Sequence, residues 1–334
     1  MRVGTFCSGT DAPIIALRRV GVAHTHIFSA ESNKHARAFI MRNSPPQHLF
    51  GDVLELDATA LPDVDLFCAG PPCQLYSKMN PRQVEDRADG MLDIRVCVLR
   101  KCLEFIVVKT PQFAVVENVI QLRKFWTDVR QTGTGTGEGD SSEGSFVSLW
   151  ARDISPLIDR VRERYEIHLS ELNPIDYGCP QQRQRLYVVM IKKGTLAFSF
   201  SFPPPIPLET SYNDILEHVE DGEIGNWEKK IVEKALVIKP TAVGVHNINV
   251  LSVQVCKDKM CLKNRPYASC LLSGSPSVVL EKKRRLTRRE LIRLQGFTDD
   301  EDFGTLSYLQ INKLVGNAMN INVLTHLFAA LFDS

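Results

Sequence analysis

A short apolar run at residues 64–69, bounded by Pro62 and Gly70, most constrains the fold of this chain. An apolar run of this length between two turn residues is typical of a buried strand in a parallel sheet. Gly70 permits a tight turn, and two prolines stiffen the chain that follows. Cys73 is therefore expected just past the carboxyl end of a strand, at the sheet edge where open α/β folds bind ligands.

Position alone leaves two interpretations of Cys73 open. A thiolate at this edge acts as a nucleophile when neighbouring groups stabilise its charge. A cysteine in a core is more often an inert packing residue. The choice between nucleophile and packing residue depends on the rest of the chain.

Apolar runs and helical periods alternate along most of the chain. We expect strands at residues 2–7, 26–30, 64–69, 113–116, 165–172 and 186–191. We expect helices at residues 34–41, 91–109, 146–164 and 323–332, and an earlier helix that Thr10 or Asp11 caps and that ends at Arg19. This alternation is typical of an α/β fold.

Polar residues follow several of these strands. Gly9 comes after the first strand, but it stands alone where the dinucleotide-binding fingerprint has three glycines. Glu31 ends the second strand about 20 residues later, where an acid often binds a ribose hydroxyl. A solvated acid at a strand end explains Glu31 equally well. Asp52 and Glu117 also stand at expected strand ends.

Composition limits the class of protein. The chain has 334 residues, a formal net charge of +1 and nine cysteines, none of them in a C-x-x-C pair. This argues against a zinc ribbon, and no metal site is expected. An odd cysteine count favours reduced thiols. Without a secretory signal or a long apolar run, we expect an intracellular protein with no membrane span, nuclear in a eukaryote and otherwise cytoplasmic.

Two polar stretches lack any apolar period. Residues 76–90 are expected to form a mobile loop beside Cys73, as active-site lids often do. Residues 132–145 are rich in Gly, Ser and Thr and are expected to form a flexible surface insert. Strand and helix signals resume after this insert, so it is not interpreted as a domain boundary.

The character of the chain changes after residue 194. The stretch that follows is first aromatic and proline-rich and then without a strong period, which predicts a small lobe of irregular or short-strand structure. Residues 281–293 carry seven Lys and Arg residues against two Glu residues. They predict a basic helix, including Arg289, near a phosphate backbone; a solvated helix face is the alternative.

Short motifs now coincide in one order: Phe6-Cys7-Ser8-Gly9, Glu31, Gly51-Asp52-Val53, Gly70-Pro71-Pro72-Cys73-Gln74, Glu117-Asn118-Val119, Gln181-x-Arg183-x-Arg185, Arg285-Leu286-Thr287-x-Arg289-Glu290, Leu294-Gln295-Gly296-Phe297 and Gly316-Asn317-Ala318. The ordered set resembles the cytosine-5 DNA methyltransferase family over nearly the whole chain. The resemblance implies a Rossmann-like, S-adenosylmethionine-dependent methyltransferase domain with a small irregular target-recognition lobe. It divides the chain into a catalytic and cofactor-binding domain (1–194), the recognition lobe (195–281) and a return segment that completes the catalytic domain (282–334).

The resemblance also implies catalytic roles. Cys73 resembles the nucleophile that adds to carbon 6 of cytosine, and Glu117 the acid that steadies ring nitrogen 3. Arg185 resembles the arginine that holds the base and orients this acid, with Arg183 next to it. The implied contacts with the nucleic acid are Pro72, Gln74, Ser77 and Arg289. The target base must be flipped out of a duplex for this chemistry.

The implied methyl donor is S-adenosylmethionine. By the same resemblance, Glu31 binds its ribose hydroxyls, Asp52 its adenine amino group, and Val53 lies beside the ring. The other residues that match cofactor-side positions are Cys7, Gly9, Leu92 and Asn317.

The chain departs from the family pattern at Cys7, Asp11, Ala12, Ser32 and Leu314. These departures keep open a regulatory homologue without catalysis, although the catalytic residues are intact. An RNA enzyme of the same family is the nearer alternative, but the Cys-Phe-Thr tripeptide of that branch is absent. A nicotinamide dehydrogenase would need a fuller glycine fingerprint. We therefore expect DNA cytosine-5 methylation; oligomeric state and target sequence are not indicated.

Overall fold

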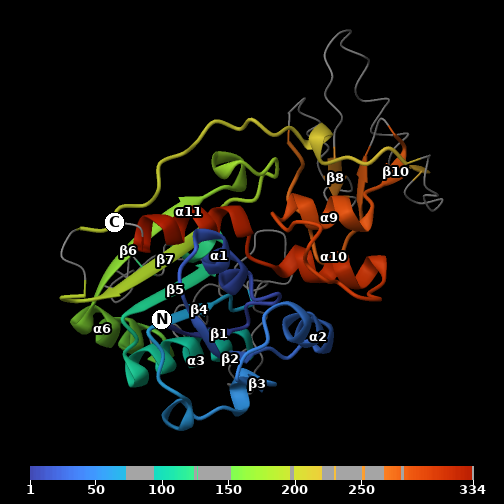
Figure 1. Ribbon diagram of the computed structural model, residues 1–334. Coiled ribbons are helices and arrows are strands. Elements are labelled where there is room, and N and C mark those ends of the chain that lie inside the picture. The colour runs from blue at the N-terminus through green and yellow to red at the C-terminus, as the bar shows by residue number, and fades with distance from the viewer. Residues whose placement is uncertain are drawn as a thin grey trace, which may run out of the picture.

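The structure is a computed structural model. It describes residues 1–72, 94–123, 126, 152–195, 199–219, 229–230, 250–252, 267–279 and 282–332. Within these ranges the chain forms a seven-stranded sheet with helices on both faces and a separate three-stranded sheet (Figure 1). The predicted loop at 76–90 and the predicted insert at 132–145 lie outside the described residues.

The large sheet contains β1 (Arg2–Phe6), β2 (Thr25–Ala30), β3 (His48–Phe50), β4 (Leu66–Ala69), β5 (Phe113–Asn118), β6 (Tyr165–Leu172) and β7 (Arg185–Lys192). Their order across the sheet is β3-β2-β1-β4-β5-β7-β6. The ladders from β3 to β5 are parallel, and β7 is antiparallel to both β5 and β6. Each strand predicted from an apolar run is confirmed, with ends within two residues of the observed ones.

The described helices are α1 (Ala12–Val20), α2 (Lys34–Asn43), α3 (Ile94–Lys109), α6 (Ser155–Arg164), α9 (Arg288–Leu294), α10 (Tyr308–Asn317) and α11 (Ile321–Phe332). Figure 1 shows α1 and α11 on one side of the sheet and α3 and α6 on the other. The small sheet joins β8 (Val250–Ser252), β9 (Ser277–Val279) and β10 (Arg284–Arg285).

Two hydrophobic cores lie on opposite faces of the large sheet, because successive strand residues point to opposite sides. In β4, Leu66 and Cys68 belong to the core under α1 and α11, whereas Phe67 and Ala69 belong to the core over α3. All four residues are fully buried. Burial on both faces explains why the run that predicts β4 is continuously apolar rather than alternating.

The basic segment near residue 285 differs from its prediction. A single basic helix over 281–293 is wrong, because Arg284–Arg285 form β10 and α9 begins only at Arg288. Thr287 starts the helix with a capping box: its side chain accepts from the backbone of Glu290, whose carboxylate accepts from the backbone of Thr287.

The stretch Tyr308–Phe332 is long and apolar enough to cross a membrane by length and composition alone, and 67% of the window tested is buried inside the protein. It comprises α10 and α11, with α11 packed against α1 (Figure 1). Burial of this kind is what a core element of the fold shows. The C-terminal segment thus returns to the sheet formed by the first half of the chain.

Candidate active site

The carboxyl ends of the first strands meet at one edge of the sheet. Phe6, the last residue of β1, pairs with Ala30 of β2. The backbone N–H of Cys7 donates to the carbonyl of Ala30 over 2.8 Å, and that of Gly70 donates to the carbonyl of Phe6 over 3.1 Å. The turns after β1, β2 and β4 therefore lie side by side, and Glu31 follows β2 directly.

Asn118 holds the turn that leads toward Cys73. Its Nδ2 donates to the carbonyl of Pro71 over 3.0 Å, and its Oδ1 accepts from the backbone of Val119 over 2.9 Å. Asn118 and Pro71 are buried, and Pro72 is partly buried. The predicted site residues that lie outside the described part of the chain are Cys73, Gln74, Ser77 and Leu92.

Glu117 and Arg185 form an ion pair beside this turn. Glu117 on β5 pairs in register with Tyr187 on β7, which brings the start of β7 to the same edge. The Nε of Arg185 lies 3.3 Å from the Oε1 of Glu117. Burial raises the pKa of the Glu117 carboxyl, and the charges of Arg185 and Arg183 only partly offset this rise. The site thus favours the protonated carboxyl more than water does.

Arg183 is tied to three separate parts of the chain. Its backbone N–H donates to the Oδ1 of Asn173 over 2.9 Å. Its guanidinium donates to the carbonyls of Leu271 over 3.3 Å and Ala318 over 3.1 Å. The side chain is buried, and its Nε has no hydrogen-bond partner among the described residues. Arg183 therefore joins the predicted catalytic, recognition and return segments at one point.

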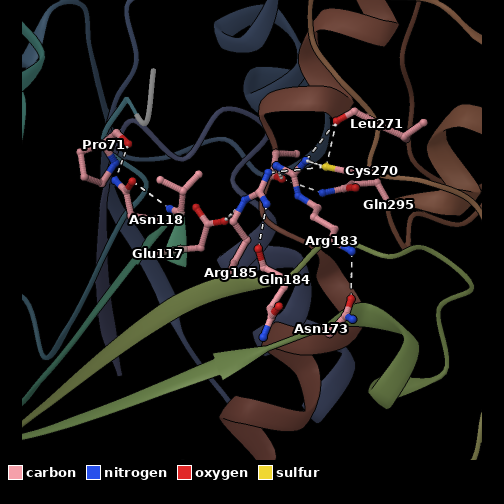
Figure 2. Close-up of polar contacts among 12 residues, drawn as sticks. Pro71, Glu117, Asn118, Asn173, Arg183, Gln184, Arg185, Cys270, Leu271 and Gln295 are labelled. Carbon is pink, nitrogen blue, oxygen red and sulfur yellow. Dashed lines mark hydrogen bonds and ion pairs between the residues drawn. The ribbon is translucent and has the colours of Figure 1, made fainter. Parts of the chain in front are cut away.

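Cys270 completes this cluster. Its Sγ lies 3.5 Å from an Nη of Arg183 and 3.6 Å from an Nη of Arg185. Figure 2 shows Glu117, Arg185, Arg183 and Cys270 drawn together in one row. Burial raises the pKa of the Cys270 thiol, but the charges of Arg183 and Arg185 outweigh burial and leave the pKa lowered. Sequence reasoning gave Cys270 no role; its only signal was its place among nine cysteines.

A buried amide network fastens the Cys270 segment to the core. The Nε2 of Gln181 donates to the carbonyl of Leu294 over 2.6 Å and to the Oε1 of Gln295 over 2.9 Å. The Oε1 of Gln181 accepts from the backbone of Leu271 over 3.1 Å. Gln181 and Gln295 are fully buried. Their fully paired amides give the segment around Cys270 a defined position.

A second group of predicted residues surrounds Glu31. Its two carboxylate oxygens accept from the backbone of Gly9 over 3.1 Å and of Asn33 over 2.9 Å. Burial raises the pKa of Glu31, while these hydrogen bonds partly offset the rise. A Cβ built on Gly9 or on Gly51 would meet no atom of the described residues within 4 Å, so this part of the chain leaves space beside both glycines.

Asp52 and Val53 lie close to Glu31 along the same edge. The backbone N–H of Glu31 donates to the carbonyl of Phe50 over 3.2 Å, which joins the end of β2 to the end of β3. Asp52 then caps a short 3₁₀ turn by accepting from Leu54 over 3.0 Å, and Val53 is buried.

Two further predicted cofactor residues, Cys7 and Asn317, differ in exposure: Cys7 is partly buried and Asn317 is exposed. Cys7 has a left-handed backbone, and burial first, then the charge of nearby anionic groups, raises the pKa of its thiol. Its thiol therefore stays protonated. Asn317 ends α10 and is exposed.

Asp11, a departure from the family pattern, points into the core. It occupies the N-cap position of α1, one of the two positions predicted, with φ 50°, but its side chain makes no capping hydrogen bond. Its carboxylate accepts from the hydroxyls of Thr5 (2.7 Å) and Ser8, and lies 3.5 Å from the Nε2 of His26. These four side chains are buried. Asp11 thus braces the turn from beneath.

Arg289 lies apart from the two groups just described. Its side chain is 64% exposed on α9, and an Nη lies 3.6 Å from the Oε1 of Glu217. Arg284, by contrast, is 1% exposed and forms a paired contact with Glu290 at 2.7 and 2.8 Å. Among the described residues, no group of three or more His, Cys, Asp or Glu side chains is placed to hold a metal ion.

Comparison with known proteins decides the family. A model of the C-5 cytosine-specific DNA methylase family matches residues 1–131 and 158–333. The chain belongs to this family. It is 27% identical over 307 residues to the Type II methyltransferase M.NgoBI of Neisseria gonorrhoeae, covering 90% of this chain and 84% of that protein. It is 23% identical over 313 residues to M.HhaI of Haemophilus parahaemolyticus, covering 90% and 85%.

Solved structures agree on the fold. The methyltransferase EhMeth of Entamoeba histolytica superposes with a TM-score of 0.69 at 16% identity, covering 100% of this chain and 98% of that one. The Dnmt2 methyltransferase of S. pombe superposes with a TM-score of 0.65 at 17% identity, with the same coverage. The predicted Rossmann-like methyltransferase fold is confirmed, as is assignment to the DNA cytosine-5 methyltransferases. The residue roles and the domain boundaries stay predictions.

Proposed function

We propose that this chain methylates carbon 5 of a flipped-out cytosine in duplex DNA, with S-adenosylmethionine as the methyl donor. One observation carries the proposal: the ion pair between Glu117 and Arg185 lies at the sheet edge beside the turn that leads to Cys73. A nucleophile, an acid and a cation for one heterocycle would thereby act at one place. Membership of the family supports the same conclusion.

In this proposal Cys73 forms a bond from its thiolate sulfur to carbon 6 of the ring. The ring electrons displaced from the carbon 5–carbon 6 double bond move toward nitrogen 3, where protonated Glu117 donates a proton. The raised pKa of Glu117 suits this role, because the carboxyl keeps its proton at higher pH. Arg185 orients the carboxyl. Carbon 5 is then an enamine carbon that can form a bond to an electrophilic methyl group. A base such as water next takes the carbon 5 proton, so that the carbon 5–carbon 6 double bond re-forms and the Cys73 thiolate leaves. Nitrogen 3 returns its proton to the Glu117 carboxylate.

The residues around Glu31 fit a nucleoside-bearing cofactor. The described residues place a buried carboxylate near Gly9 and Gly51 and leave space beside both glycines, and Asp52 follows the next strand. Glu31 would hold the ribose hydroxyls, and Asp52 with Val53 would hold the adenine ring. When bound, S-adenosylmethionine supplies an electrophilic methyl group on a sulfonium centre. Cys7, Gly9 and Asn317 would complete this side of the site.

The deciding experiment is transfer of labelled methyl from S-adenosylmethionine to duplex DNA and, in parallel, to total small RNA. We expect label on DNA cytosine, and none with Cys73→Ala at equal folded concentration. Label on RNA alone would assign the enzyme to RNA instead. Full transfer by Cys73→Ala would reject the cysteine mechanism.

A further inference from the structure

The proposed reaction leaves Cys270 without a role, although it touches both arginines of the site. Its sulfur lies within 3.6 Å of guanidinium nitrogens of Arg183 and Arg185. Arg185 in turn reaches Glu117 at 3.3 Å. Arg185 therefore stands between a carboxyl on β5 and a sulfur that arrives from more than eighty residues further along the chain.

Two positively charged side chains contact the sulfur of Cys270. Arg183 and Arg185 are permanently positive, and Arg183 is buried. A protonated Glu117, which the reaction requires, adds no negative charge. The Cys270 sulfur faces the two guanidiniums, which favour a thiolate, and the carbonyl of Leu271 at 3.4 Å, to which a protonated thiol would donate. Tyr187 feels the same arginines, but burial raises the pKa of its phenol and keeps it neutral.

We propose that Cys270 is a positioning residue of the active site, whose thiolate shares the guanidiniums of Arg183 and Arg185 with Glu117. The thiolate offsets the positive charge of the arginines. Their pull on the Glu117 carboxylate weakens, so Glu117 keeps its proton at working pH. This role in catalysis rests on the proposed function; the ionised state of Cys270 does not.

Two further contacts keep the sulfur in place. The residue after Cys270 is bound at both backbone groups: its N–H by Gln181 and its carbonyl by Arg183. Gln181 itself is fully buried and bound to Leu294 and Gln295. Cys270 is therefore delivered by a rigid segment rather than by a mobile side chain.

The first test needs no methyl transfer. The intact protein is treated with iodoacetamide over a pH series, and alkylation of the peptide that carries Cys270 is followed by mass spectrometry. We expect a reaction midpoint below about pH 8.5, the ordinary value of a thiol. Arg185→Gln should raise this midpoint, whereas Arg152→Gln, an exposed arginine paired with Asp153, should not. A midpoint at or above the ordinary value in the unaltered protein would overturn the proposal.

The second test measures the pH profile of single-turnover methyl transfer. Loss of the thiolate in Cys270→Ser lets the arginines lower the pKa of Glu117, so the alkaline limb moves to lower pH. At pH values above the pKa of Glu117 in both proteins, each pH unit of this shift lowers the rate of the variant about tenfold relative to the unaltered protein. Well below both pKa values the two rates are equal. Cys270→Asp, which keeps an anion, should restore the limb. The control is Cys97→Ser on α3, which should keep the unaltered profile.

The outcomes separate the two proposals. A loss of rate in Cys270→Ser that is equal at all pH values would show a packing role and overturn the positioning role. Absence of methyl transfer by the unaltered protein would overturn the proposed function. The alkylation midpoint would still decide the charge of Cys270 in that case.

Discussion

At the scale of single residues, Glu117 shows how one side chain is held between two charge states. Burial disfavours its carboxylate, and the arginine 3.3 Å away favours it. Burial prevails, because a buried carboxylate loses hydration that a single ion pair does not fully replace. An acid in this balance gives up a proton only when negative charge develops next to it, as it does on a heterocycle under nucleophilic attack.

We therefore expect Glu117→Gln to lower the rate of single-turnover methyl transfer by a factor of about 10² to 10⁴, the usual contribution of general acid catalysis. The dissociation constant for duplex DNA should stay unchanged, since the substitution removes a proton rather than a binding surface. Glu166→Gln, an exposed glutamate on β6, is the control. Equal losses in binding and in rate would contradict the role of Glu117.

Asp11 has an unfavourable backbone conformation but makes favourable buried side-chain contacts. Its φ of 50° favours glycine, and yet its carboxylate satisfies two buried hydroxyls and faces His26. We expect Asp11→Ala to lower the free energy of unfolding by about 2–4 kcal/mol, because it keeps the strain and leaves buried polar groups unpaired. Asp11→Gly should cost less, since it relieves the backbone. Urea denaturation measures both.

Asp63→Ala provides the baseline for this series. Asp63 is 65% exposed and pairs with Lys109 at 3.2 Å, so its loss should change stability by less than about 0.5 kcal/mol. If Asp11→Ala matched this small change, the buried network beneath the turn would have no structural value.

At the scale of elements, some basic side chains around α9 form contacts within the protein and others are exposed to solvent. Arg284 forms a buried ion pair with Glu290, and Arg293 pairs with Asp299. The guanidinium of Arg285 lies 5.7 Å from the centre of the Tyr308 ring. Arg289 stays 64% exposed on the first turn of α9. A phosphate backbone would therefore meet fewer charges here than the sequence shows.

This division predicts opposite phenotypes for two neighbouring arginines. Arg289→Ala should leave stability unchanged, weaken DNA binding across sequences and reduce the salt slope of binding by about one. Arg284→Ala should instead cost about 3–5 kcal/mol of stability, because Glu290 stays buried without its partner. Binding titrations at several salt concentrations and urea denaturation separate the two. An unchanged salt slope in Arg289→Ala would exclude Arg289 from the phosphate contact.

These elements also show what a sequence can reveal. β4 and β6 follow from local apolar patterns, and their observed ends agree with the prediction within two residues. The sequence does not show which arginine near residue 285 is buried and which is exposed. Glu290 pairs with Arg284 because both are buried in the folded protein, and their spacing in the chain does not reveal this. The role of Cys270 also could not be predicted, because its arginine partners lie 85 and 87 residues away in the chain.

At the scale of the whole molecule, the candidate site is formed by segments that lie far apart in the sequence. Gly9 and Glu31 follow the first two strands, Glu117 lies on β5, and Arg183 lies in the connection between β6 and β7. Ala318, which binds Arg183, belongs to the C-terminal segment. No single segment holds the site, so its integrity reports on the fold of the whole chain.

Binding of the cofactor product should therefore stabilise the entire protein. S-adenosylhomocysteine at about 100 times its dissociation constant should add about 2.7 kcal/mol to the free energy of unfolding. For a chain of 334 residues, that corresponds to a rise in Tm of roughly 4 °C, measured by thermal unfolding without any substrate. Glu31→Ala should remove the rise at the same ligand concentration, because it deletes the carboxylate at the carboxyl end of β2. Asp63→Ala should retain it in full. A normal rise in Glu31→Ala would show that the cofactor binds elsewhere, whatever the enzyme's activity.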